Sequence, residues 1–285
     1  MTIPEAIVLG LVQALTEFLP VSSSGHLRLA RELLGAQAEF ALGFDLLLHI
    51  GTLVAVVAVY RGTIARVAVD AVRGLVAMTR GPVAALEKHE GLRFAILVVI
   101  ASVPTGIIGL TLDDLVEGTF VTAPVVGALL LVNGVMLWVA RRDDGEEPGE
   151  RRWAVAGIGP REALLIGLAQ GIAVLPGISR SGATIVMALA LGARRMKAAE
   201  FSFLLSIPAI AGAAVLKLDS GLFDVAPGEA MAWGIGAVTS ALAGIGALVF
   251  LLGTLRRARF HRFSFYCWAL GTFAIVAGLA GWTGG

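Results

Sequence analysis

The sequence has little charge and only one cysteine. Of its 285 residues, 15% are charged, whereas soluble domains carry about 25%. Hydrophobic residues make up 57% of the chain, and the mean hydropathy is +0.86. A soluble fold of this size could not bury so much apolar surface behind a polar exterior. The composition therefore excludes a soluble enzyme and a disordered chain, and the lone Cys267 excludes an intrachain disulfide.

The sequence also lacks an excess of either charge. It has 22 Lys and Arg residues against 21 Asp and Glu residues, for a net charge of +1. This balance gives no indication of a nucleic-acid partner. The first residues, Met1 to Glu5, contain no basic region, so we expect no cleavable signal peptide.

Six apolar stretches are long enough to cross a bilayer, which takes about 20 mostly apolar residues. They are residues 41–60, 92–112, 121–140, 201–218, 229–252 and 263–282. Two shorter stretches, 6–19 and 163–175, end at Pro20 and Pro176, and each is followed by a Ser/Gly-rich turn and another short apolar segment. We interpret them as re-entrant hairpins, because irregular backbone at membrane depth is tolerated where it lines a protein cavity. The expected fold is an all-α integral membrane protein with six transmembrane helices and two re-entrant helical hairpins.

The charges give this layout an orientation. If each long stretch crosses once and each hairpin returns to the side it left, most Lys and Arg residues fall on one face. They lie in residues 61–93, 141–161, 194–197 and 256–262. The positive-inside rule makes this face cytoplasmic. We therefore expect both termini on the outer side.

The two broken stretches resemble each other. Gly10-Leu-x-Gln13 and Gly167-Leu-x-Gln170 begin them, and both continue through Leu-Pro to Ser-x-Ser-Gly. Three predicted spans separate the hairpins, so the second must enter the membrane from the opposite face. This arrangement is an inverted-topology repeat, with a site between the broken helices. We expect a single membrane domain, 1–285, made of repeat 1 (about 1–140), a linker (141–160) and repeat 2 (about 161–285).

Polar side chains gather at both breaks. The first has Gln13, Glu17, Ser22, Ser23, Ser24 and His26, and the second has Ser179, Arg180, Ser181 and Thr184. An ionisable residue inside a membrane is costly and is by default a functional candidate. Free N–H groups at a helix start, with hydroxyls and the planar guanidinium of Arg180, suit phosphate oxygens. Two such starts that face each other predict a phosphate-binding pocket within the bilayer.

Each of these residues also has a structural interpretation when it is taken alone. The serines would cap helices, Glu17 would pair with an arginine, and Gln13 would hydrogen-bond locally. His26 would be a polar residue inside the helix bundle. Asp45 and His49, four residues apart on the first span, are interpreted as more structural than functional. The joint occurrence of Glu, His, Ser and Arg at the two breaks favours a functional site.

The residues around the breaks resemble the undecaprenyl-diphosphatase family, the bacitracin-resistance proteins of bacterial cell-wall synthesis. Residues 13–26, 176–184 and 200–208 carry the resemblance, which covers essentially the whole chain. It implies a phosphatase of the bacterial cytoplasmic membrane that needs Mg²⁺ or Ca²⁺ and removes the terminal phosphate of undecaprenyl diphosphate. The first acidic position of the family's motif is often Glu, whereas this chain has Gln13.

The leading interpretation gives each polar residue a role. Glu17, with Gln13 beside it, would hold the metal or act as base, and His26 would be the general acid and base. Ser23 would be the nucleophile, with Ser22 as the alternative, and a metal-activated water fits the sequence equally well. The groups that would bind the phosphates are Ser22, Ser24, Ser179, Arg180, Ser181 and Thr184.

The sequence is also compatible with a second function. Inverted repeats with broken helices are also transporter architecture, so the rival is a polyprenyl-phosphate flippase or a secondary transporter of an anionic substrate. The leading interpretation has the pocket open to the outer face, with a polyprenyl diphosphate lipid and the bilayer as partners. The sequence leaves a homo-oligomer open.

Overall fold

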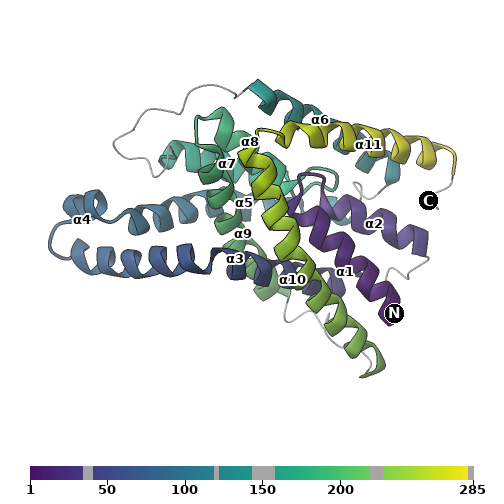
Figure 1. The fold of residues 1–285 in the computed structure, drawn as a ribbon, viewed down its shortest axis with the longest axis horizontal. Helices are drawn as coiled ribbons and strands as arrows, with labels where there is room; N and C mark the ends of the chain where they lie inside the picture. The colour runs from purple at the N-terminus through teal and green to yellow at the C-terminus, as the bar shows by residue number, and fades with distance from the viewer. Residues whose placement is uncertain (35–40, 119–121, 143–157, 218–226, 282–285) are drawn as a thin grey trace.

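The computed structural model describes residues 1–34, 41–118, 122–142, 158–217 and 227–281. Within these residues the secondary structure is almost entirely helical (Figure 1). The helices are α1 (Ile3–Phe18), α2 (Ser23–Leu34), α3 (Ala41–Met78), α4 (Pro82–Lys88), α5 (Glu90–Gly118), α6 (Ala123–Val139), α7 (Pro160–Ile172), α8 (Arg180–Ala190), α9 (Arg195–Lys217), α10 (Pro227–Arg256) and α11 (Phe263–Leu279), with short 3-10 helices η3 (Ala140–Arg142) and η5 (Phe260–Arg262).

Five helices of the described chain are long and apolar enough to cross a membrane. These are α3, α5, α9, α10 and α11 with the turn before it. The remaining predicted span, 121–140, forms the apolar but shorter helix α6 of 17 residues. Helix α3 continues 18 residues past the predicted end at residue 60, because no proline interrupts it before Pro82. The multi-pass membrane fold is thus confirmed, while passage of the broken helices into the bilayer stays a prediction.

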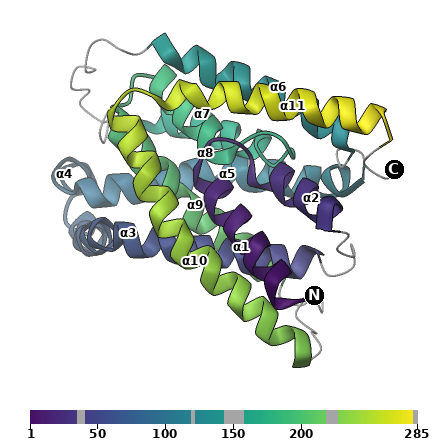
Figure 2. The ribbon, with the colours of Figure 1, turned by 45° about the vertical axis from the view of Figure 1, so that its right-hand side comes forward.

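Helices that are far apart in the sequence pack side by side in pairs. Helix α1 lies along α10, α5 along α7, and α6 along α11, and Figures 1 and 2 agree on the α1–α10 and α6–α11 pairs. Glycines permit the closest approach: a Cβ on Gly127 of α6 would lie 2.6 Å from the carbonyl oxygen of Gly271 on α11. Small residues at helix crossings are typical of membrane bundles, because they let backbones approach.

The two broken stretches begin in the same way. Pro4 is the second residue of α1 and Pro160 the first residue of α7, and in each case a glutamate shortly after the proline accepts a hydrogen bond from the backbone before the helix. Proline suits the first helical turn because its missing N–H has no intrahelical partner there. Each helix ends near the predicted proline, and a second helix, α2 or α8, runs on from it. We call residues 19–24 the first break and residues 173–184 the second break, so that each break includes the start of the helix after it.

Aromatic packing fixes the end of α1 beside the first break. Phe18 is 2% exposed, and its ring lies 5.8 Å from that of Phe203 on α9 in an edge-on contact. Phe203 also packs on Tyr60 of α3. Elsewhere, large apolar side chains such as Leu110 and Leu242 are about two-thirds exposed, which suits lipid contact. The predicted linker 141–160 lies mostly outside the described residues.

Candidate active site at the two helix breaks

The structure brings the two breaks into direct contact. The backbone N–H of Gly177 donates to the hydroxyl of Ser22 at 3.0 Å. The hydroxyl of Ser181 donates to the carbonyl oxygen of Phe18, also at 3.0 Å. These bonds join α1 and α2 to α7 and α8, so the residues predicted to face each other do so.

Gly177 can occupy its place only because it has no side chain. Its φ is +112°, a left-handed conformation that other residues rarely adopt. A Cβ there would lie 2.6 Å from the Cβ of Leu129 and 2.7 Å from the carbonyl oxygen of Val126. Helix α6 therefore packs directly on the second break. Ser22 also has a positive φ, of 70°, which turns the chain at the first break.

Asn133 on α6 holds both breaks, and the sequence did not single it out. Its Nδ2 donates to the carbonyl oxygen of Pro20 at 2.9 Å, and its Oδ1 accepts from the N–H of Ser179 at 3.0 Å. The side chain is fully buried. The available signal was one amide within an otherwise apolar predicted span, because a polar group in lipid needs a partner.

The Glu17 carboxylate lies where the two breaks meet. Its Oε1 forms an ion pair with Nη2 of Arg180 from the second break. Its Oε2 accepts hydrogen bonds from the Ser23 hydroxyl at 2.6 Å and from Nε2 of Gln13 at 3.1 Å. The Glu17 side chain is 5% exposed, whereas that of Arg180 is 23% exposed. The arrangement places a hydroxyl, a carboxylate and a guanidinium in one chain of contacts.

A further side chain reaches the same carboxylate. His49 of α3, interpreted from sequence as more structural than functional, has its Nε2 3.5 Å from Oε2 of Glu17. Among the described residues, no three His, Cys, Asp or Glu side chains lie close enough to hold a metal ion by themselves. The amide oxygen Oε1 of Gln13 is a further potential metal ligand, because it is buried and has no hydrogen-bond partner.

His26 lies one turn into α2 and faces α11. Its Nδ1 is 2.7 Å from the carbonyl oxygen of Ser22, and its Nε2 is 2.8 Å from the hydroxyl of Tyr266. A carbonyl oxygen only accepts, so Nδ1 donates and Nε2 accepts the Tyr266 proton. The two rings also stack, with centroids 5.6 Å apart. These contacts place His26 beside the first break, and none of them is with Glu17. Tyr266 is a neighbour that the sequence did not indicate.

The predicted phosphate-binding hydroxyls of the second break are largely committed to the protein. Ser179 caps α8 by accepting from the N–H of Gly182 at 3.1 Å. Thr184 donates to the carbonyl oxygen of Arg180 at 2.8 Å and is fully buried. At the first break, Ser24 is exposed and lies 3.3 Å from the Ser22 hydroxyl. Arg180, the first residue after the cap of α8, is half-buried and supplies the positive charge at the site.

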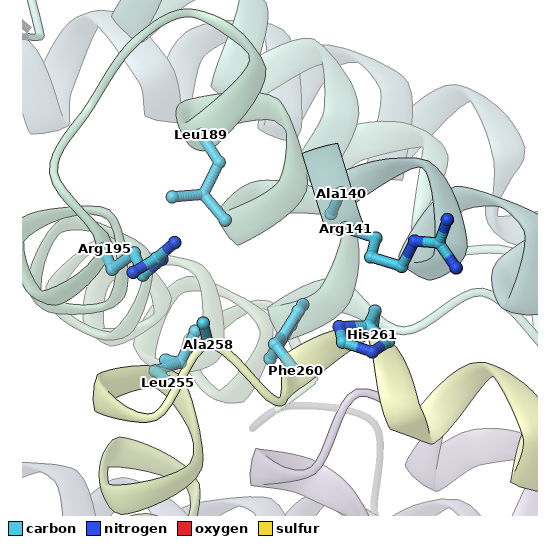
Figure 3. Close-up of a pocket in the computed structure, with 8 residues that line it drawn as sticks. All are labelled: Ala140, Arg141, Leu189, Arg195, Leu255, Ala258, Phe260 and His261. Atoms are coloured by element: carbon cyan, nitrogen blue, oxygen red, sulfur yellow. The ribbon is translucent and has the colours of Figure 1, made fainter. Parts of the chain in front are cut away.

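A separate hollow lies at another part of the molecule. It is lined by residues of η3, α8, α9, α10 and η5, among them Arg141, Arg195 and His261. Figure 3 shows Arg195 at its left and His261 at its right. None of the predicted site residues lines this hollow, so it is distinct from the contact of the two breaks.

Comparison with known proteins gives consistent relatives. The family model described as "Bacitracin resistance protein BacA" matches residues 6–273. The chain is 46% identical to the "Undecaprenyl-diphosphatase" of Desulfosudis oleivorans, over 96% of this chain and 98% of the relative. It is 42% identical to the protein of the same name from Desulforapulum autotrophicum, over 98% and 99%. The similarly named protein of Korarchaeum cryptofilum is 38% identical over 95% and 97%.

Proposed function

The chain belongs to the bacitracin resistance protein BacA family, and we propose that Glu17, Ser23 and Arg180 form the centre of its active site. The enzyme is a membrane-embedded phosphatase that hydrolyses undecaprenyl diphosphate to undecaprenyl phosphate and phosphate. One observation carries the assignment of the site. The Glu17 carboxylate accepts a hydrogen bond from the Ser23 hydroxyl of one break at 2.6 Å and pairs with Arg180 of the other.

Ser23 is the proposed nucleophile, with Glu17 as its base. As the Ser23 oxygen attacks the terminal phosphorus, its proton passes along the existing hydrogen bond to Oε2 of Glu17. The bond from phosphorus to the bridging oxygen breaks, and undecaprenyl phosphate leaves with the electron pair. Water then attacks the phosphoserine and gives a proton to His26, while Glu17 returns its proton to the departing Ser23 oxygen, so that phosphate and the free Ser23 hydroxyl are released.

Arg180 supplies positive charge to the reacting phosphate. The guanidinium offers a planar fork of donors that matches phosphate oxygens. When the diphosphate enters, Arg180 turns from Glu17 to the substrate, which stabilises the charge of the transferring group and leaves the carboxylate able to take the Ser23 proton. His26, whose Nε2 accepts a hydrogen bond from Tyr266, is the proposed group for proton transfer to and from water or the leaving oxygen.

A divalent cation, Mg²⁺ or Ca²⁺, fits the donors at this site. The buried and unpartnered Oε1 of Gln13 and the Glu17 carboxylate offer oxygen ligands. One carboxylate suffices where the substrate phosphates supply further oxygens. When it is bound, the ion neutralises phosphate charge and polarises the bond that breaks. Gln13 and Glu17 are the residues that would hold it.

The two halves of the chain are proposed to be inverted repeats. Reciprocal packing supports this proposal, since α1 of the first half lies along α10 and α7 of the second half lies along α5. The breaks would then reach the site from opposite membrane faces. Helix α4 lies at the opposite end of the molecule from the N-terminus (Figure 1), which supports a cytoplasmic basic face and an outer N-terminus. We propose that both termini lie outside and that the site opens to the outer face.

The test of the function is phosphate release from undecaprenyl diphosphate by the purified protein in detergent with Mg²⁺. We expect steady release without any gradient, and a loss of at least about 100-fold in kcat for Glu17→Ala, as for removal of a catalytic base. A protein that binds the lipid but releases no phosphate would be a carrier. A Glu17→Ala protein with full activity would overturn the assignment of the site.

A further inference from the structure

His49 presents one ring nitrogen to the Glu17 carboxylate, and its orientation is fixed. Its Nδ1 lies 2.7 Å from the carbonyl oxygen of Asp45, one turn earlier on α3. Because a carbonyl oxygen can only accept, Nδ1 carries the hydrogen of this bond. The ring therefore directs Nε2 toward Oε2 of Glu17, 3.5 Å away.

This arrangement is the one that metal-binding histidines adopt. Such a histidine donates its second ring N–H to a backbone carbonyl or a carboxylate, which fixes the tautomer and aims the other nitrogen at the metal. In the neutral ring, Nε2 and the Glu17 oxygen both offer lone pairs to the space between them. Two acceptors that face each other in this way are stabilised by a cation that both can bind.

Gln13 supplies an independent indication of a ligand at the same place. Its side chain is fully buried, and its Oε1 has no hydrogen-bond partner. The amide nitrogen lies 3.1 Å from the Glu17 Oε2 that His49 faces. A half-turn of the amide exchanges its oxygen and nitrogen, so the Gln13 oxygen can occupy the position beside this carboxylate oxygen.

The spacing of these donors suits one ion. Adjacent ligands of an octahedral cation lie about 3 Å apart when each metal–ligand bond is a little over 2 Å. The separations of 3.1 and 3.5 Å from Oε2 of Glu17 to the Gln13 amide and to His49 are close to this value. Protein side chains then offer three ligands from α1 and α3, and the diphosphate supplies the others.

We propose that His49 is a protein ligand, together with Glu17 and Gln13, of the divalent cation that accompanies the diphosphate. An imidazole ligand favours transition-metal ions, whereas Mg²⁺ and Ca²⁺ prefer oxygen. His49 therefore raises the affinity of this chain for Mn²⁺ and Zn²⁺ relative to Mg²⁺. The inference rests on the proposed function, because the remaining ligands come from the substrate.

Charge couples the ion to the substrate. Arg180 already pairs with the single negative charge of Glu17, so a divalent cation alone meets a site with no excess of negative charge. The diphosphate brings several negative charges and draws Arg180 to itself, which frees the carboxylate for the metal. Mn²⁺ should consequently bind more tightly when a diphosphate analogue is present.

The experiment measures Mn²⁺ binding to the full-length protein in detergent by electron paramagnetic resonance, with and without methylenediphosphonate. Pulsed spectra detect the nitrogen of a coordinated imidazole directly. The variants are His49→Leu, which removes the ligand, and His49→Gln, which replaces it with an amide oxygen. The matched control is His261→Leu, because His261 lines the separate hollow of Figure 3. Helix content and a single elution peak establish that each variant is folded.

The wild type and His261→Leu should bind Mn²⁺ with the nitrogen signal, more tightly with the analogue. His49→Leu should lose the signal and at least about 10- to 100-fold in affinity, the loss that follows removal of even an outer-shell partner of a ligand. His49→Gln should lose the signal and shift its preference toward Mg²⁺. The proposal is overturned if the wild type lacks the signal, if the signal survives in His49→Leu, or if the affinity changes less than twofold. The last outcome would mean that Nε2 carries a proton and forms an ion pair with Glu17.

Phosphate release by the same preparations separates this inference from the proposed function. A wild-type protein that hydrolyses undecaprenyl diphosphate but binds Mn²⁺ independently of His49 overturns the metal ligand alone. A protein that binds Mn²⁺ through His49 but releases no phosphate from the lipid overturns the function and leaves the metal site.

Discussion

The backbone N–H of Gly177 donates a hydrogen bond to the hydroxyl of Ser22 at 3.0 Å, and so joins the two helix breaks across 155 residues of sequence. Both residues have positive φ, so each break turns sharply where it meets the other. The contact sets the distance between α1 and α8. Together with the bond from Ser181 to Phe18, it holds Arg180 within reach of Glu17.

Gly177→Ala should destabilise the protein and abolish most activity. The added Cβ would lie 2.6 Å from the Cβ of Leu129, and overpacking of this kind costs about 1–3 kcal/mol, with a further cost of about 1–2 kcal/mol for a positive φ. The measurement is the midpoint of thermal unfolding in detergent, together with phosphate release. Gly62→Ala on α3 is the control, because a Cβ there meets nothing within 4 Å. A Gly177→Ala protein as stable and active as the control would contradict the packing described.

Asn133→Ala should loosen both breaks at once. The substitution leaves the N–H of Ser179 without its partner and leaves the carbonyl oxygen of Pro20 with the longer contact from Cys267 Sγ at 3.7 Å, and a buried group left unpaired costs about 1–3 kcal/mol. Asn133→Asp keeps an acceptor for Ser179 but replaces the donor to Pro20 and Cys267 with a buried carboxylate oxygen that faces the Pro20 carbonyl oxygen. We therefore expect both variants to have a lower unfolding midpoint than the wild type. Equal midpoints for the wild type and the Ala variant would show that α6 does not hold the breaks.

The sequence predicted the breaks because their signals are local. Pro20 and Pro176 remove backbone donors and end helices whatever the rest of the fold does. The pairing of Glu17 with an arginine was considered from sequence as a structural interpretation, and the structure shows that this arginine is Arg180. The run 41–60 was recognised as apolar, yet the helix continues to Met78. Hydropathy predicts where a membrane span ends, but a helix can continue past that point into a more polar sequence.

The residues that the sequence did not assign act through tertiary contacts. Asn133 lies 113 residues from Pro20, and Tyr266 lies 240 residues from His26. Within its own helix each is one polar group in an apolar run. His49 has Asp45 as a local partner, which favours a structural interpretation until α1 brings Glu17 beside it. Such juxtapositions follow from how helices cross, and a single sequence contains no direct signal of that.

Ser23→Ala should abolish turnover with little change in KM. Its hydroxyl donates to Glu17, and a nucleophile with its base contributes mainly to kcat. Rapid acid quenching with the terminal phosphate labelled should trap a phosphoserine in the wild type. The Ala variant should trap none. A wild type that turns over without any phosphoprotein would assign the attack to water, with Ser23 then orienting that water beside Glu17.

Tyr266→Phe should lower kcat modestly and leave the fold intact. The tyrosine hydroxyl donates to Nε2 of His26, and a single neutral hydrogen bond contributes about 0.5–1.5 kcal/mol, which corresponds to about two- to tenfold in rate. The stacked ring remains in the variant, so the position of the His26 ring is retained.

Tyr60→Phe is the matched control, because the buried hydroxyl of Tyr60 has no hydrogen-bond partner. Its removal should leave kcat unchanged and stability equal or slightly higher. If both variants have wild-type kcat, the hydrogen bond from Tyr266 does not affect catalysis by His26. That result would count against a role of His26 in proton transfer. If Tyr266→Phe loses far more than tenfold, the hydroxyl itself takes part in moving the proton.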